Sequence, residues 1–236
     1  MGEIFGALVD GMTVILNALY GVTAAIGVPN YGLAIVLLTV IIKVVLYPLN
    51  YRQMHSMVAM QRLQPKIKEI QQKYKKDPQK LQQKMMELYK EQGVNPLSGC
   101  LPLLIQLPIL IALYRALLNL FQTPGVEHLD FLWIANLGQR GIHRPVDILL
   151  PLLAGVTTYW QMRLTPQASG QEQMQRVMSL TMPAFIAYIT ITLPAGLGLY
   201  WVVFNLLTIA QQYVMNRRLV GVGKEALEGE GSGKKR

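Results

Sequence analysis

Lys43 is the residue of this sequence whose chemistry most needs an explanation, because it is a cation inside the apolar stretch of residues 31–49. Such a stretch is long enough to cross a bilayer, whose hydrocarbon core takes roughly 20 helical residues. A charge near its centre costs on the order of 3 kcal/mol, so residues of this kind usually face a polar cavity or a partner. The alternative is a lysine that snorkels to the interface with its stem in lipid. The position of Lys43 is compatible with both interpretations.

Other polar side chains share helix faces inside the apolar stretches. Thr39 lies four residues before Lys43, and other polar residues recur at helical spacing in the last stretch. Residues three and four apart lie on one face of a helix. Any one of these positions is explained most simply as a contact between helices, but together with the cation they predict a shared hydrophilic cavity. The candidate residues of this cavity are Lys43, Thr39, Gln161, Trp201, Asn205, Thr208 and Gln106.

The patterns that would indicate catalysis or metal binding are missing from the sequence. The interiors of the apolar stretches contain no Asp or Glu, so an aspartyl protease or a carboxylate proton relay would lack its acids. No phosphate-binding loop pattern is present. Cys100 is a single cysteine and forbids an internal disulfide, and the three histidines lack ligand spacing. We therefore expect no enzymatic activity, no cofactor and no metal.

The composition indicates a membrane protein. Of 236 residues, 52% are hydrophobic and 15% are charged, which is too apolar for an ordinary soluble domain. The first 30 residues carry apolar positions at helical spacing, which predict an extracytosolic interfacial amphipathic helix, with a short additional span as the alternative. The remaining pattern predicts an all-α integral membrane protein with a core over residues 97–215. Its five transmembrane helices are expected at residues 31–50, 97–121, 146–163, 177–194 and 195–215.

The net charge of +9 is unevenly distributed along the chain. Eighteen Lys and Arg residues fall within residues 51–96, around residues 163–176 and after residue 215, whereas two fall within residues 122–145. Residues 1–30 carry none. Because basic loops stay in the cytosol, this distribution places the N-terminus outside and the C-terminus in the cytosol. Residues 216–236 are expected to form a basic, flexible cytosolic tail.

Residues 51–96 have the pattern of a cytosolic antiparallel helical hairpin. Apolar residues recur every three or four positions from Leu63 to Tyr74 and from Leu81 to Leu88, and a turn signal, Asp-Pro, separates the two runs. The lysine-rich outer faces suit either a solvated surface or a docking arm for acidic lipid headgroups, ribosomal RNA or a partner protein. The lysines that would act in recruitment are Lys66, Lys68, Lys73, Lys75, Lys76, Lys80 and Lys84.

Several strings of the sequence resemble the YidC/Oxa/Alb family of membrane protein insertases. They include NPLSGCLPLLIQLPI at residues 95–109 and PAGLGLYW at residues 194–201, within a resemblance that covers essentially residues 30–215. The resemblance implies a short, multi-pass protein of the bacterial cell membrane. Such a protein inserts nascent membrane proteins and helps them fold without hydrolysing nucleotide. Its positively charged, hydrophilic groove would open to the cytosol and to lipid, with Lys43 as the groove cation.

The same resemblance implies partners. Nascent membrane proteins would be the substrates, and Thr39 and Trp201 match positions that the family uses to contact them. The Sec translocon, anionic lipids and the ribosome, which the basic tail would touch, are further expected partners, without a dedicated nucleic-acid site. One departure is Lys43, because bacterial members usually carry Arg there and a buried lysine can lose its proton. Two other classes stay open, a small-anion transporter or channel using the Lys43 cavity and a structural membrane scaffold.

Overall fold

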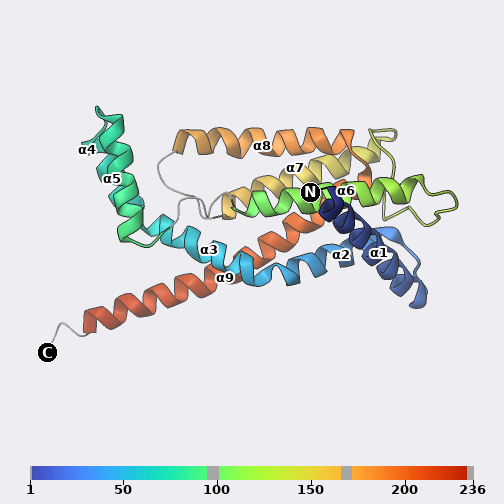
Figure 1. Ribbon diagram of the computed structural model, residues 1–236, viewed down its shortest axis with the longest axis horizontal. Coiled ribbons are helices and arrows are strands. Elements are labelled where there is room, and N and C mark those ends of the chain that lie inside the picture. The colour runs from blue at the N-terminus through green and yellow to red at the C-terminus, as the bar shows by residue number, and fades with distance from the viewer. Residues whose placement is uncertain (1, 95–100, 166–171, 233–236) are drawn as a thin grey trace.

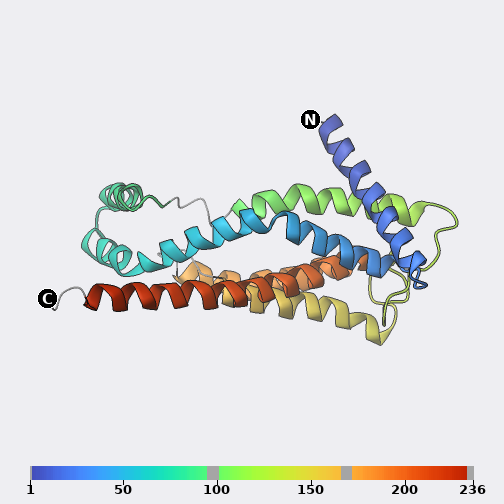
Figure 2. The same cartoon turned by 90° about the horizontal axis from the view of Figure 1, so that it is seen from below.

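The computed structural model describes residues 2–94, 101–165 and 172–232 of the chain. Over these ranges the regular structure is helical, apart from one isolated β-bridge between Phe131 and Ile134, so the predicted all-α class is confirmed. The helices that run lengthwise through the molecule lie side by side in both views (Figure 1, Figure 2). They are α2 (Tyr31–Val45), α6 (Leu101–Gln122), α7 (Leu149–Leu164), α8 (Glu172–Thr192) and α9 (Ala195–Ser232).

Helix α9 holds this bundle together, because it contacts α2, α6, α7 and α8. The core of the bundle is apolar and includes fully buried side chains from three helices, such as Ile35, Leu113 and Tyr200. Helix α1 (Gly2–Ala25) packs against α2 and α6 and crosses the bundle obliquely in both views (Figure 1, Figure 2).

By length and hydropathy the described residues contain three or four candidate membrane spans, so the count of five stays a prediction. Among the described residues, three helices are long and apolar enough to cross a membrane, namely α1 from Phe5, α6 from Leu104 and α9 as far as Met215. Helix α2 meets the condition only together with α3 (Tyr47–Arg62), as a span broken by a bend of 60°. Helix α7 has 16 residues, and the apolar part of α8 is also short. Helix α1 thus has the dimensions of the additional span considered above.

The bend between α2 and α3 ends the first helix earlier than predicted. Pro48 stands in the first turn of α3, where its missing N–H needs no partner. Its ring would clash with the carbonyl four residues earlier if α2 continued straight, so the chain turns at Leu46. As a result α2 ends at Val45 rather than residue 50, and Lys43 lies in its last turn.

Two further helices, α4 (Gln64–Lys73) and α5 (Pro78–Glu91), lie apart from the bundle at what we call the hairpin end (Figure 1). Their predicted apolar seams meet, because Ile67 and Leu88 are buried against each other with Ile70 and Met85 beside them. Asp77 accepts a hydrogen bond from the backbone N–H of Lys80 at 3.1 Å and caps α5. The helix pair begins later than residue 51, since α3 takes residues 47–62.

Residues 123–144 connect α6 to α7 at the opposite end, which we call the loop end. This connection bonds to the turn between α8 and α9 through its backbone. Leu137 O accepts from Gly196 N at 2.7 Å, Gln139 O accepts from Ala195 N at 2.9 Å, and Gly141 N donates to Ile191 O at 2.8 Å. The break between α8 and α9 falls at the predicted Pro-Ala-Gly sequence.

Helix α9 continues to Ser232, where the sequence suggested a flexible tail from residue 216. The physical reason lies in composition. Residues 216–228 contain Arg, Leu, Lys, Glu and Ala, which are good helix formers, and no proline. The two glycines in this stretch weaken the helix by about 1 kcal/mol each but do not break it.

Candidate functional site

The Lys43 side chain points into the bundle towards α9. Only 8% of Lys43 is exposed, and its ammonium donates a hydrogen bond to the hydroxyl of Thr208. The same ammonium lies 3.4 Å from the centroid of the Phe204 ring, which is a cation–π contact. Thr208 donates its own hydroxyl proton to the carbonyl of Phe204 at 2.7 Å, so its oxygen is free to accept from the lysine.

The partners of Lys43 are electrically neutral. The ion pairs of the described residues include Lys80 with Asp77, Lys84 with Glu87 and Arg144 with Asp147, and none of these three includes Lys43. A hydroxyl and a ring face solvate the ammonium without cancelling its charge. The bundle therefore holds a lysine that no carboxylate of the described residues pairs with, close to where α2 bends.

A second polar group joins α7 to α9. The amide of Asn205 donates to Thr157 at 3.1 Å and to Thr158 at 2.9 Å, and the indole N–H of Trp201 donates to Thr158 at 3.2 Å. Both threonine hydroxyls donate in turn to carbonyls of their own helix, which leaves their oxygens as acceptors. This arrangement brings Trp201 and Asn205 together as their spacing predicts, and it works as an interhelical contact.

The other candidate residues are placed separately. Thr39 is fully buried and donates to Ile35 O at 2.6 Å within α2. Gln106 donates to the hydroxyl of Tyr200 at 2.6 Å and so ties α6 to α9. Gln161 is half-buried on α7, one turn beyond Thr157. Among the described residues no hydrogen bond joins these three glutamine and threonine side chains to Lys43.

Phe204 and Thr158 contribute to these contacts but were not among the residues predicted from the sequence. Phe204 is apolar and gives no signal in a search for polar stripes, yet it lies four residues before Thr208 on the same face of α9. An aromatic residue four positions from a predicted polar groove residue is a signal that could have indicated Phe204 as a partner of the cation. Thr158 follows Thr157 directly, and sequence spacing could not show that both hydroxyls face α9.

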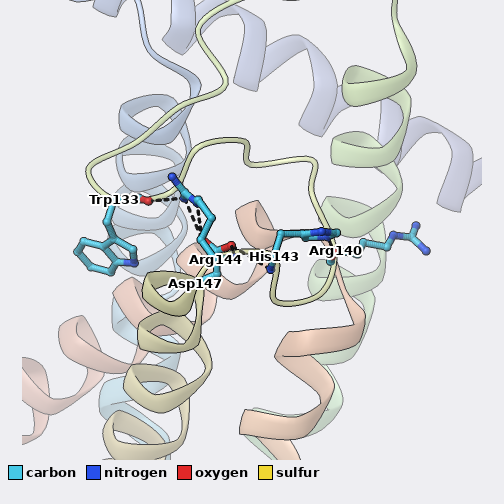
Figure 3. A network of polar contacts seen from close by, with 5 residues as sticks. All are labelled: Trp133, Arg140, His143, Arg144 and Asp147. Atoms are coloured by element: carbon cyan, nitrogen blue, oxygen red, sulfur yellow. Dashed lines mark hydrogen bonds and ion pairs between the residues drawn. The ribbon is translucent and has the colours of Figure 1, made fainter.

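The loop end has a polar network of its own, shown in Figure 3. One guanidinium nitrogen of Arg144 donates to Trp133 O and to the carboxylate of Asp147, both at 2.8 Å. The hydrogen bonds from Arg144 hold the pKa of Asp147 below its ordinary value. A ring nitrogen of His143 lies 2.7 Å from Arg140 O. A small cavity beside this network is lined by Trp133 and Asp147, among other residues. Lys43 is not one of its lining residues.

The hairpin end contains buried polar atoms of a different kind. The side-chain nitrogens of Gln53 and Gln211 and the side-chain oxygen of Gln212 are buried without a hydrogen-bond partner among the described residues, as is the indole nitrogen of Trp133 at the loop end. The nitrogen of Gln212 donates to Thr165 at 2.7 Å. On the same two helices, α3 and α9, a small apolar cluster forms from Met54, Met57 and Met215.

The lysines of the hairpin end are exposed, as predicted for the outer faces of α4 and α5. Lys84 donates to Glu87 at 2.6 Å, which raises the pKa of Lys84 and lowers that of Glu87. Exposed pairs of this kind contribute little stability. The described residues contain no group of three or more His, Cys, Asp or Glu side chains that could hold a metal ion, and Cys100 lies outside them.

An all-helical bundle with apolar spanning helices, a buried cation and amide side chains in its interior defines a multi-pass membrane protein with a partly polar core. Residues 22–222 match the family described as 60Kd inner membrane protein. The match covers most of the chain, and the chain belongs to this family. It is therefore a multi-pass protein of a bacterial membrane.

Curated relatives support the same assignment. The chain is 44% identical over 209 residues to the membrane protein insertase YidC of Helicobacter pylori, over 89% of this chain and 36% of the relative. It is 41% identical over 191 residues to the membrane protein insertase YidC of Geobacter sulfurreducens, over 80% of this chain and 34% of the relative. The chain thus spans about a third of the length of these relatives.

A solved structure shares the fold. A crystal structure of an active YidC insertase, with its first transmembrane domain resolved, superposes with a TM-score of 0.67 at 33% sequence identity. The superposition covers 89% of this chain and 46% of that chain. The family resemblance stated from sequence strings is confirmed.

Proposed function

We propose that this protein is a membrane protein insertase and chaperone. It receives segments of nascent membrane proteins from the cytosol and releases them into lipid, without nucleotide hydrolysis and without covalent chemistry. Membership of the 60Kd inner membrane protein family supports the proposal, as do the relatives named as insertases. The observation that carries it is the ammonium of Lys43, buried inside the bundle with neutral partners only.

The charge of Lys43 would act on acidic residues in the translocated tail of a substrate. At an effective dielectric constant near 20, two opposite charges 4 Å apart attract each other by about 4 kcal/mol. Since no carboxylate of the described residues is paired with Lys43, this attraction is available to an incoming group. The tail would hold its place only transiently, because the ring and hydroxyl contacts of the lysine re-form when it leaves.

The polar side chains near Lys43 would line the path of the tail. We assign this role to Thr208 on α9 and, further along the same helix, to Asn205 and Trp201, with Thr157 and Thr158 opposite. Thr39, Gln161 and Gln106 are assigned to the same path. Polar groups of this kind lower the free energy of a hydrophilic segment at membrane depth.

The arriving transmembrane helix would leave along the apolar faces of α7 and α9. Leu152, Val156 and Trp160 are exposed on α7, and Leu206 is exposed on α9. Burial of roughly 20 apolar residues in lipid then supplies the driving force, at about 25 cal/mol for each Å² of apolar surface removed from water. No nucleotide is required for that step.

We also propose an orientation and a set of partners. The distribution of Lys and Arg supports an orientation with the N-terminus and the loop end outside, and the hairpin end and the C-terminus in the cytosol. In that orientation the exposed lysines of α4 and α5 face anionic lipid headgroups and arriving substrates. The basic C-terminal residues would contact the ribosome, and the Sec translocon would cooperate on larger substrates.

Insertion into proteoliposomes containing the purified protein tests the proposal. With a single-span substrate that carries an acidic tail, Lys43→Glu should abolish insertion, because the groove charge is reversed, and Lys43→Arg should retain it. A substrate with a neutral tail is the control and should be much less affected by either change. Full activity of the Lys43→Glu variant would refute the charge mechanism. Flux of a small anion without any insertion would instead favour a transporter.

A further inference from the structure

The position of the Lys43 ammonium inside the bundle requires an explanation of its own. Lys43 lies in the last turn of α2, only two residues before the helix ends at Val45. A lysine stem at the end of a membrane helix ordinarily reaches for the aqueous interface. Here its ammonium contacts α9 instead, so groups on α9 must compensate it for the water it gives up.

Phe204 provides the first compensation. The ammonium lies 3.4 Å from the centroid of its ring, well inside the range of about 6 Å in which a ring face attracts a cation. The attraction strengthens when the pair is desolvated, and Lys43 is buried. The ring is itself held in place, because it packs against Tyr200 with centroids 5.8 Å apart.

Thr208 provides the second compensation. Its hydroxyl proton is used in a hydrogen bond of 2.7 Å to the carbonyl of Phe204, so the oxygen presents its lone pairs to the ammonium. Phe204 and Thr208 are four residues apart and lie on one face of α9. Both contacts therefore point at the same place on α2.

We propose that Phe204 and Thr208 are positioning residues that keep the Lys43 ammonium inside the bundle and prevent it from reaching the interface at the hairpin end. The pair is neutral, so it holds the lysine without forming an ion pair. A carboxylate forms a stronger, charge-assisted hydrogen bond with an ammonium than a ring face or a hydroxyl does. Resting on the proposed function, the pair would thus present Lys43 to acidic substrate tails and yield it to them.

Accessibility of Lys43 to a polar amine-acylating reagent tests the positioning directly, without reference to insertion. The full-length protein would be placed in lipid nanodiscs, which expose both faces, and acylation of Lys43 would be followed by peptide-resolved mass spectrometry. Phe204→Leu keeps an apolar side chain but removes the ring face, and acylation should accelerate about tenfold. Phe204→Tyr keeps the ring and should label at the rate of the unmodified protein.

The hydroxyl contact has its own pair of variants. Thr208→Val is close in shape but has no acceptor, and acylation of Lys43 should accelerate about threefold. Thr208→Ser keeps the hydroxyl and should restore the slow rate. Phe185→Leu on α8 is a matched control, because the same substitution falls on an exposed ring, and it should leave the rate unchanged.

Unchanged acylation of Lys43 in both Phe204→Leu and Thr208→Val overturns the inference, whatever happens to insertion. Equal acceleration by Phe204→Leu and Phe204→Tyr also overturns it, because the ring would then act by shape alone. Faster acylation with reduced insertion of acidic-tailed substrates supports both the positioning and the proposed function. Faster acylation with unchanged insertion supports the positioning and counts against the charge mechanism.

Discussion

The two ends of this bundle are built in different ways. At the loop end, residues 123–144 are joined to the turn between α8 and α9 by backbone hydrogen bonds, and Arg144 ties Trp133 to Asp147. At the hairpin end, α3 and α9 meet through methionine side chains, and buried glutamine atoms lack partners among the described residues. Backbone bonds fix one geometry, whereas methionine adapts to several.

This contrast indicates which end of the molecule is rigid and which end can adapt its packing. Each buried polar group without a partner costs about 1–3 kcal/mol, a penalty that water or a passing polypeptide would relieve. Among the described residues, the loop end carries one such group, the indole N–H of Trp133, against three at the hairpin end, and it is packed tightly around glycines such as Gly198. A bundle that is tightly packed at the loop end and more adaptable at the hairpin end suits a substrate path that opens only at the hairpin end, as the proposed function requires.

The largest effect is expected from overpacking the loop end. In Gly198→Ala, the new Cβ would lie 2.7 Å from a methyl of Thr190 and 3.0 Å from one of Leu150, and both side chains are buried. Overpacking of this kind costs about 1–3 kcal/mol, so the melting temperature in detergent should fall by roughly 5 °C.

Gly21→Ala provides the control for that prediction. Gly21 is exposed on α1, and an added Cβ would meet nothing within 4 Å. Alanine favours a helix over glycine by about 1 kcal/mol, so this variant should be as stable as the original protein or slightly more so. Equal destabilisation by the two substitutions would contradict the view that the loop end is the tightly packed one.

A smaller effect of opposite sign is expected at the hairpin end. Gln53→Met replaces a buried amide, whose nitrogen has no partner among the described residues, by an apolar side chain of similar size. The melting temperature should rise by a few degrees, since an unsatisfied group of this kind costs about 1–3 kcal/mol. Insertion should fall if the amide serves the substrate path.

Gln61→Met on the same helix is the matched control. Because Gln61 is exposed, this change should leave the melting temperature and insertion unaltered. A drop in melting temperature for Gln53→Met would mean that Gln53 stabilises the fold. The hairpin end would then be less compliant than its unpaired atoms indicate.

The smallest effect is a pH dependence confined to the loop end. Arg144 holds the pKa of Asp147 below its ordinary value, so the carboxylate stabilises the folded loop above the unfolded-state pKa of about 4. That contribution should be lost as the pH falls through the lowered pKa. Amide hydrogen exchange of His143 and Arg144, whose N–H groups donate to Asp147, reports it.

Protection of these amides, corrected for intrinsic exchange, should be constant between pH 7 and pH 5 in the original protein and fall below about pH 4. Asp147→Asn should already weaken it at pH 7. The Gln53 region has no such carboxylate contact among the described residues and should show no matching change. Equal pH sensitivity of amide exchange at both ends would contradict the assignment of the loop end's pH dependence to Asp147.

Much of the architecture could be predicted from hydrophobic pattern. The all-α class, the break at Pro194 and the seam of α4 and α5 follow from apolar spacing and turn residues. Pattern could not predict the bend at Leu46, because Pro48 suits either a kinked span or a new helix start. The loop of residues 123–144 has no hydrophobic periodicity, so its backbone hydrogen bonds to α8 and α9 could not be predicted either.

The candidate site divides in the same way. Spacing along α9 placed Trp201, Asn205 and Thr208 on one side of the helix. It could not predict how deeply each side chain is buried or which group it contacts. It could not distinguish Thr208, which contacts the cation, from Asn205, which ties α9 to α7. Gln106 shows the same limit, because its partner Tyr200 is 94 residues away in the chain.

The presence of a lysine inside an apolar, membrane-length stretch and the gathering of basic residues in a few segments follow from the residues alone. Those are local properties, set by residue type and by spacing along one helix. The direction in which Lys43 points depends on the tertiary fold, because α9 brings Phe204 and Thr208 to it from 161 and 165 residues away. A buried charge is governed by the groups that surround it in space, and these come from elements that the linear pattern does not pair.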